Sequence, residues 1–189
     1  MPSKGLKRIQ VPEFHMTWKG FRVDPKALNR FLNLVEMQKS ENVPIIFPQV
    51  VSFPLVMSLV THPQFPEPIW NALQVRNVMT QFKKIKVGDV LDFDLSTCGQ
   101  RILEKGAEVE LKMTAKVEGE VAWEGTTTFY YRGRFGTPES PAGNSQPPEI
   151  KPEKTIEWEM PSGGGAAYGD LSGDYNGIHL WTWYAKLFG

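Results

Sequence analysis

Residues 108–117 read Glu-Val-Glu-Leu-Lys-Met-Thr-Ala-Lys-Val, and this stretch decides the fold because its polar and apolar residues alternate without a break. Side chains of a β-strand point to opposite faces in turn, so the pattern predicts a strand with one buried and one wet face. Residues 91–96 and 121–131 repeat the alternation, and glycine-containing turns at 105–106 and 118–119 separate the runs. Such spacing is typical of hairpins, so we predict an antiparallel sheet rather than a parallel sheet with helical crossovers.

Two segments that precede these strands carry helical patterns instead. Residues 24–38 open with Asp24 as a cap and Pro25 in the first turn, and their apolar residues recur at spacings of three and four. We expect this helix to cover one face of the sheet. Residues 45–61 predict a buried helix that begins near Gln49 and that Pro54 can bend or shift. Helices together with an antiparallel sheet make the fold class α+β.

Composition limits the possible partners and compartments. The chain has 189 residues, which allows one or two domains, and its 21 basic and 21 acidic residues cancel, which argues against a nucleic-acid partner. The single cysteine, Cys98, excludes an internal disulfide, is expected to be buried and inert, and suits the cytoplasm. Prolines interrupt the longest apolar stretch, 43–60, so no membrane span is expected. The basic N-terminus is either a solvated tail or an organellar transit peptide.

Acid, amide and imidazole groups gather in one stretch only. Residues 168–183 read Tyr-Gly-Asp-Leu-Ser-Gly-Asp-Tyr-Asn-Gly-Ile-His-Leu-Trp-Thr-Trp. Asp174 lies five residues before His179 with Asn176 between them, so a loop that turns into a helix can direct a carboxylate and an imidazole at one water molecule. An isolated Asp and His near a helix start often serve only as a cap and a surface residue. The surrounding Ser-Gly pair and the order of the residues favour an acid–base site.

This stretch resembles the signature of the MaoC-like (R)-specific enoyl-CoA hydratases and dehydratases, a Ser-Gly-Asp-x-Asn-Pro-x-His run. The resemblance is specific over 168–189 and covers the N-terminal part only as a pattern of helix and strands. Gly177 departs from it, because the family usually has proline there. A proline at 177 is expected to stabilise the fold if φ at this residue is about −65° and its backbone N–H makes no hydrogen bond. The matching residues are Ser172, Gly173, Asp174, Asn176 and His179, with Ile178 as the apolar residue before the histidine.

The resemblance implies a two-domain hotdog protein, in which each antiparallel sheet wraps around a long apolar helix. The expected divisions are a degenerate N-terminal hotdog over 1–135, a proline-rich linker over 136–152, and the start of a second hotdog over 153–189. That second domain looks cut off early, before the strands and the backbone amide that hold the substrate carbonyl in this family. The resemblance implies catalytic roles for Asp174 and His179. It implies substrate- or water-positioning roles for Asn176, Ser172, Gly173 and Tyr168.

The implied activity is reversible hydration of trans-2-enoyl-CoA thioesters to (R)-3-hydroxyacyl-CoA thioesters, a lyase reaction of fatty acid metabolism. The expected partner is an acyl-CoA, and the expected assembly is a homodimer or a pseudo-dimer of hotdog domains. We expect no cofactor, because water is the only co-substrate. The glycines at 163–165 are not followed by the Lys-Ser/Thr of a phosphate loop and are predicted to form a mobile turn. Residues 170–176 lack the glycine and glutamate of a calcium loop, so no metal is expected.

Other functional classes remain open at this point. One is a hotdog thioesterase or acyl-binding module, which would not need His179. Another is a non-catalytic assembly subunit, in which an aromatic C-terminal helix with Trp181, Trp183 and Phe188 docks a partner. The apolar helix over 50–60 either lines an acyl tunnel or belongs to an ordinary core.

Overall fold

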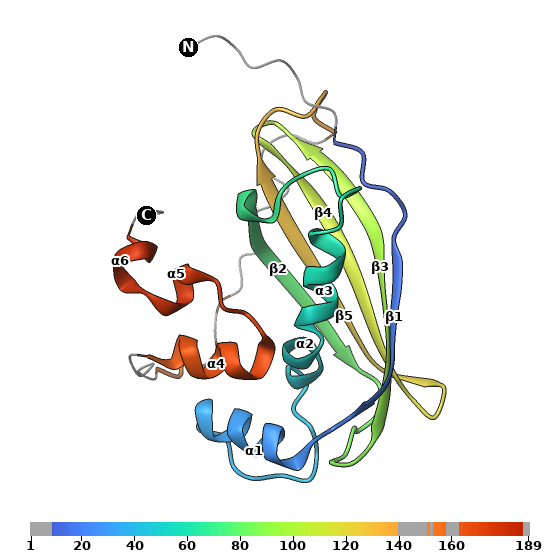
Figure 1. Ribbon diagram of the computed structural model, residues 1–189, viewed down its shortest axis with the longest axis vertical. Helices are drawn as coiled ribbons and strands as arrows, with labels where there is room; N and C mark the ends of the chain where they lie inside the picture. Colours follow the sequence, from blue (N-terminus) through green and yellow to red (C-terminus); the bar gives the residue numbers. More distant parts are fainter. Residues whose placement is uncertain (1–8, 140–150, 152, 158–162, 187–189) are drawn as a thin grey trace.

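The computed structural model of the chain contains one antiparallel sheet of five strands in the order β1-β3-β4-β5-β2 (Figure 1). It describes residues 9–139, 151, 153–157 and 163–186. Every pairing between neighbouring strands is antiparallel, as the hairpin spacing predicts. The strands are β1 (His15–Arg22), β2 (Ala72–Gln81), β3 (Val90–Leu103), β4 (Gly106–Val117) and β5 (Glu120–Arg132).

The alternating stretch at 108–117 lies in β4, the middle strand of the sheet, and Val109, Leu111, Met113 and Ala115 are buried as predicted. Val117 is half-buried, and Glu108, predicted on the wet face, is buried. The predicted turn at 118–119 is confirmed, and both residues have positive φ, 52° at Glu118 and 81° at Gly119. A two-residue turn with this backbone matches the right-handed twist of the strands it joins. The sequence did not reveal β1, because the alternation of Met16 and Trp18 is interrupted where the register shifts before Phe21.

One buried, interrupted helix packs along the concave face of the sheet. It consists of α2 (Phe47–Val51) and α3 (Phe53–Val60), which meet at Ser52. Pro54 lies in the first turn of α3, where its missing N–H costs no hydrogen bond. The predicted effect of this proline is therefore seen as a break between α2 and α3. Val50, Leu59 and Val60 are all buried in the central hydrophobic core. The structure therefore places this segment in the core.

The first helix, α1 (Pro25–Leu34), begins as predicted, because the Asp24 carboxylate accepts a hydrogen bond from the Lys26 N–H at 3.0 Å. It ends at Leu34, with Val35 as the cap residue before the left-handed Glu36, and so is shorter than expected. Its predicted place on a sheet face is wrong. It lies at the foot of the molecule, against α4, and its Phe31 ring contacts Phe47 of α2 edge-on at 5.5 Å (Figure 1).

The C-terminal part contains three short helices, α4 (Gly164–Ser172), α5 (Gly177–Leu180) and α6 (Thr182–Ala185), and α4 packs against α1 and α2. Residues 163–165 do not form a turn of their own, because the last two of them begin α4. The aromatic segment predicted as one helix is divided at Trp181, whose backbone is extended. The sequence predicts that residues 155–159 form a strand, but residues 155–157 are not in one, and 158–159 lie outside the described residues, as do Phe188 and most of the predicted linker.

Sheet and enclosed helix together make an α+β hotdog fold, as the resemblance implied. A short 3₁₀ turn, η1 (Ile69–Asn71), leads into the edge strand β2. No helix among the described residues is long and apolar enough to cross a membrane.

Charged side chains cover the convex face of the sheet in cross-strand pairs. Lys116 contacts Asp94 at 2.7 Å, and Lys112 contacts Glu124 at 2.8 Å. Cys98 is exposed rather than buried as predicted, because it follows Asp94 and Ser96 on the outward-facing side of β3, at the bulge between Thr97 and Gly99. Partial burial, then the nearby Glu110, raises the pKa of its thiol.

Among the described residues, one buried side-chain polar atom has no hydrogen-bond partner. The Tyr131 hydroxyl is buried, and no hydrogen-bond partner lies within reach among the described residues. Burial, and then the carboxylate of Glu67, raises the pKa of this phenol. An unpaired buried hydroxyl costs about 1–3 kcal/mol relative to its hydrated state.

Tyr131→Phe should therefore raise the free energy of unfolding by roughly 1 kcal/mol at pH 7, because it removes the unpaired hydroxyl and keeps the ring. In the wild type, the unfolded chain loses the phenolic proton near its ordinary pKa of about 10 while the folded protein keeps it. Stability should then fall as the pH rises above about 10, and fall less steeply in the variant. Urea denaturation at pH 7 and at several alkaline pH values measures both effects, and a less stable variant at pH 7 would contradict the prediction.

Candidate functional site

The loop that carries Asp174 begins where α4 ends. Gly173 closes the helix in the left-handed region at φ 78°, and its N–H donates to the Gly169 carbonyl at 2.8 Å. Glycine suits this position because a side chain would be strained at that φ. The buried Ser172 hydroxyl donates to the Tyr168 carbonyl at 2.9 Å and accepts from the Asp174 N–H at 3.1 Å. Ser172 and Gly173 thus fix the direction in which the chain leaves the helix.

Two successive turns then connect Asp174 to His179. Oδ1 of Asp174 accepts from the Asn176 N–H at 3.1 Å, and Oδ1 of Asn176 accepts from the Ile178 N–H at 3.3 Å. Asn176 is therefore the N-terminal cap of α5, a role that short amide side chains perform well. The His179 N–H donates to the Asn176 carbonyl at 2.9 Å and completes the first turn. The carboxylate of Asp174 and the backbone of His179 are therefore both held by local hydrogen bonds.

Nε2 of His179 lies 3.7 Å from Oδ2 of Asp174. This separation exceeds a direct hydrogen bond and allows both groups to reach one water molecule. The side chain of His179 is 50% exposed and that of Asp174 is 18% exposed, so the imidazole is accessible while the carboxylate is largely shielded. The pair that the sequence predicted is thus brought together in space.

Tyr168 is the remaining sequence-predicted site residue, and it packs against the central core from α4. Burial, and then the carboxylate of Asp174, raises the pKa of its phenol. The phenol therefore stays protonated at neutral pH and can donate a hydrogen bond beside the pair.

A second histidine–carboxylate pair has the same separation. Nε2 of His15 on β1 lies 3.7 Å from Oδ1 of Asp94 on β3, a contact between strands that sequence spacing could not indicate. Asp94 is also paired with Lys116 through its other oxygen, and 67% of the His15 side chain is exposed. Distance alone therefore does not identify an acid–base site. The loop geometry around Asp174 distinguishes the C-terminal pair.

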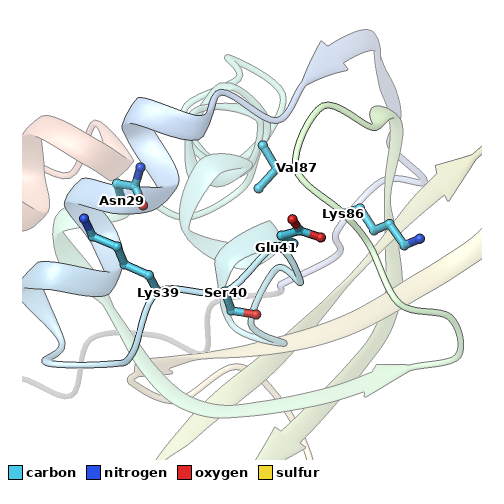
Figure 2. A pocket seen from close by; sticks show the side chains of 6 residues that line it. All are labelled: Asn29, Lys39, Ser40, Glu41, Lys86 and Val87. Carbon is cyan, nitrogen blue, oxygen red and sulfur yellow. The ribbon is translucent and has the colours of Figure 1, made fainter.

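The larger of two described surface cavities, about 600 Å³, lies away from the pair (Figure 2). Its wall includes Lys39, Glu41 and Lys86, and none of the residues of the 168–183 stretch. Figure 2 shows the two lysine side chains pointing away from each other, so they do not converge on an anion. Within the described ranges, no group of three or more His, Cys, Asp or Glu side chains could hold a metal ion.

Sequence analysis did not assign a role to three residues that contact the loop, namely Asp170, Tyr175 and Arg30. The Tyr175 hydroxyl donates to Oδ1 of Asp170 at 2.7 Å, and this hydrogen bond is the main reason that the pKa of Tyr175 is raised. Nη2 of Arg30, on α1, donates to the Asp170 carbonyl at 3.4 Å. The N-terminal part of the chain thus contacts the motif directly.

Gly177, the position that departs from the family's proline, lies against two aromatic rings. It occupies the first position of α5, where a proline ring fits the helix geometry. A Cβ atom here would lie 2.9 Å from Cδ1 of Tyr184 and 3.2 Å from Cε3 of Trp181. These contacts argue against a stabilising effect of proline at this position, because the expectation considered only the backbone.

Comparison with known proteins gives related sequences and structures. The chain is 30% identical over 183 residues to 3-hydroxyacyl-thioester dehydratase X of Mycobacterium tuberculosis, covering 95% of this chain and 64% of that protein. It therefore spans less than two thirds of this relative's own length. No family profile matches the chain.

Similar solved structures are also those of dehydratases. A crystal structure of HtdX from Mycobacterium tuberculosis matches with a TM-score of 0.73 and 28% identity, covering 93% of this chain and 68% of that chain. A MaoC-like dehydratase from Phytophthora capsici matches with a TM-score of 0.70 and 17% identity, covering 97% of this chain and 69% of that chain. At 17% identity, the match to the Phytophthora capsici protein shows similarity of fold only.

Gly177→Pro should lower the free energy of unfolding by roughly 1 kcal/mol, since forcing atoms against packed rings outweighs the smaller entropic gain of a proline. The Tyr184 side chain is partly exposed and can move aside, so the loss of stability should be small for a steric clash. Thermal or urea denaturation measures the change. Combining the substitution with Tyr184→Ala, and comparing with Tyr184→Ala alone, should remove most of the penalty. A proline variant more stable than the wild type would contradict the predicted clash with the aromatic rings.

Proposed function

Because the chain groups with the hotdog dehydratases in sequence and in fold, we propose that it carries the acid–base pair of an acyl-thioester hydratase. The proposed reaction is the reversible addition of water to a trans-2-enoyl thioester, giving an (R)-3-hydroxyacyl thioester, with an acyl-CoA as the substrate. The single observation that carries this proposal is the 3.7 Å separation between Oδ2 of Asp174 and Nε2 of His179 in a loop fixed by its own hydrogen bonds.

In the proposed mechanism, Asp174 and His179 hold one water molecule between them. The water oxygen bonds to C3 of the enoyl group as one of its protons passes to the pair, and a proton held by the pair is delivered to C2. The C2–C3 double bond becomes a single bond, so the atoms of one water are added in full. This chemistry needs a base and an acid on one face of the double bond, and a carboxylate beside an imidazole provides both.

The surrounding residues are proposed to orient this pair rather than react. Asn176 holds one carboxylate oxygen through its N–H, which leaves the other free for the water. Ser172 and Gly173 direct the chain out of α4, and the Tyr168 phenol is a neutral donor beside Asp174. Negative charge that develops on the thioester oxygen needs a fixed donor, and we propose that a backbone amide from a second set of strands, outside these residues, supplies it.

The proposed domain arrangement follows from the same relationship. We propose that 1–135 is a degenerate first hotdog, that 136–152 is a linker, and that 153–189 opens a second hotdog, so that the functional unit is a dimer or pseudo-dimer of these domains. Support comes from Arg30 on α1, which contacts α4 and so joins the first domain to the motif.

The assembly-subunit alternative has one observation in its favour. Trp181 and Trp183 are 53% and 66% exposed, and their rings stack with centroids 6.4 Å apart. Exposed aromatic pairs are common at protein interfaces. The hydratase assay below separates the two functions, because a subunit without catalysis gives no turnover with any variant.

In the full-length gene product, Asp174→Asn and His179→Ala should each lower the rate of crotonyl-CoA hydration by at least ~100-fold, the scale of a lost acid–base group. The rate is followed by the loss of the enoyl-thioester absorbance, and release of free CoA thiol is measured in parallel to detect a thioesterase.

His15→Ala is the matched control, since His15 has the same distance to a carboxylate but no motif around it. Its activity should equal that of the wild type. Near-normal hydration by either motif variant, or thiol release without hydration, would overturn the proposed function.

A further inference from the structure

We infer that α4 sets the spacing of the acid–base pair through two glycines on one of its faces, Gly165 and Gly169, against which the loop from Asp174 to His179 is packed. Their role is one of positioning, and the inference rests on the proposed function. Residues four apart lie on the same face of a helix, about 6 Å apart along its axis. This face also includes Gly173, which ends the helix.

The first contact joins Gly165 to the histidine end of the loop. A Cβ atom at position 165 would overlap the carbonyl oxygen of His179 and lie 2.9 Å from its carbonyl carbon. These are backbone atoms, which cannot rotate away as the end of a flexible side chain can. Only glycine at this position lets the first turn of α4 contact the backbone of His179.

The second contact joins Gly169 to the carboxylate end. A Cβ atom here would lie 3.0 Å from the carbonyl oxygen of Asp174 and 3.2 Å from Cδ1 of the Tyr175 ring. That ring is held in place by its hydroxyl, which donates to Oδ1 of Asp170 at 2.7 Å. The same face of the same helix therefore contacts both residues of the pair.

Gly164 shows that close approach is not common to every glycine of this helix. It lies one position before Gly165, and a Cβ atom there would meet nothing within 4 Å. Each glycine inside a helix costs about 1 kcal/mol relative to alanine, so glycine at 165 and 169 is unfavourable for α4 itself. The contacts with the backbone of the loop account for both residues.

A rigid element that touches both ends of the loop fixes the distance between them. The Asp174–His179 separation of 3.7 Å then depends on how closely each backbone approaches α4. A methyl group at position 165 must push His179 outward while Asp174 stays in place. Since misplacement by about 1 Å can cost on the order of 100-fold in rate, this displacement should affect turnover more than binding.

The test compares Gly165→Ala with Gly164→Ala in the full-length gene product. Gly165→Ala should lower kcat for crotonyl-CoA hydration on the order of 100-fold with little change in KM. Gly164→Ala should keep wild-type kcat and KM, and its stability should be equal or slightly higher. Gly169→Ala, whose closest contact is 3.0 Å, should show an intermediate loss of kcat and is the second variant if Gly165→Ala does not fold.

An independent readout uses the imidazole itself. The chain has three histidines, so the proton resonances of the His179 ring can be assigned by comparison with His179→Ala. They should move in Gly165→Ala and stay unchanged in Gly164→Ala. If the wild type hydrates no enoyl thioester, the proposed function fails, whereas the resonances still test the packing. A folded Gly165→Ala protein with wild-type kcat and unmoved His179 resonances would overturn the inference.

Discussion

The burial of α2 and α3 in the concave face of the sheet is the packing on which the rest of the molecule depends. The Trp123 indole, on β5, is fully buried and donates to the Ile45 carbonyl at 2.7 Å, which anchors the segment just before α2 to the sheet. This interrupted helix in turn supports the C-terminal part. A Cβ atom at Gly173 would lie 3.5 Å from Cγ of Pro54, so the end of α4 rests on the first turn of α3. The position of the acid–base loop is therefore fixed by the core of the N-terminal sheet.

Much of this sheet could be predicted from the sequence because strand alternation is a local pattern. The run at 108–117 and the turn at 118–119 were sufficient to identify β4, β5 and their connection. Strand β1 could not be found in this way, since its alternation is interrupted before Phe21 and its identity depends on pairing with β3, far along the chain. The same reason applies to α1, whose amphipathic pattern predicts a helix but does not say which element it packs against.

The candidate site shows the same division between local and tertiary information. Asp174 and His179 are close in sequence and joined by two turns, so their spatial proximity was predictable. The contacts of Arg30 and of Gly165 were not, because they join α1 to α4 and the start of α4 to a residue fourteen positions later. The repeat of glycine at 165, 169 and 173 was a visible signal of close packing. To interpret this repeat, one has to know which backbone atoms pack against these glycines.

The outward-turned Cys98 has a practical consequence for spectroscopy. It is the only thiol in the chain, it is exposed, and the groups that act on its pKa, Glu110, Lys112 and Glu124, belong to the convex face of the sheet. A fluorophore or spin label attached here would be separated from the helical layer by the sheet itself. Because the thiol pKa is raised, coupling needs mildly alkaline buffer. The molecule thus already contains a single attachment point from which movements of α4 can be followed without introducing or removing another cysteine.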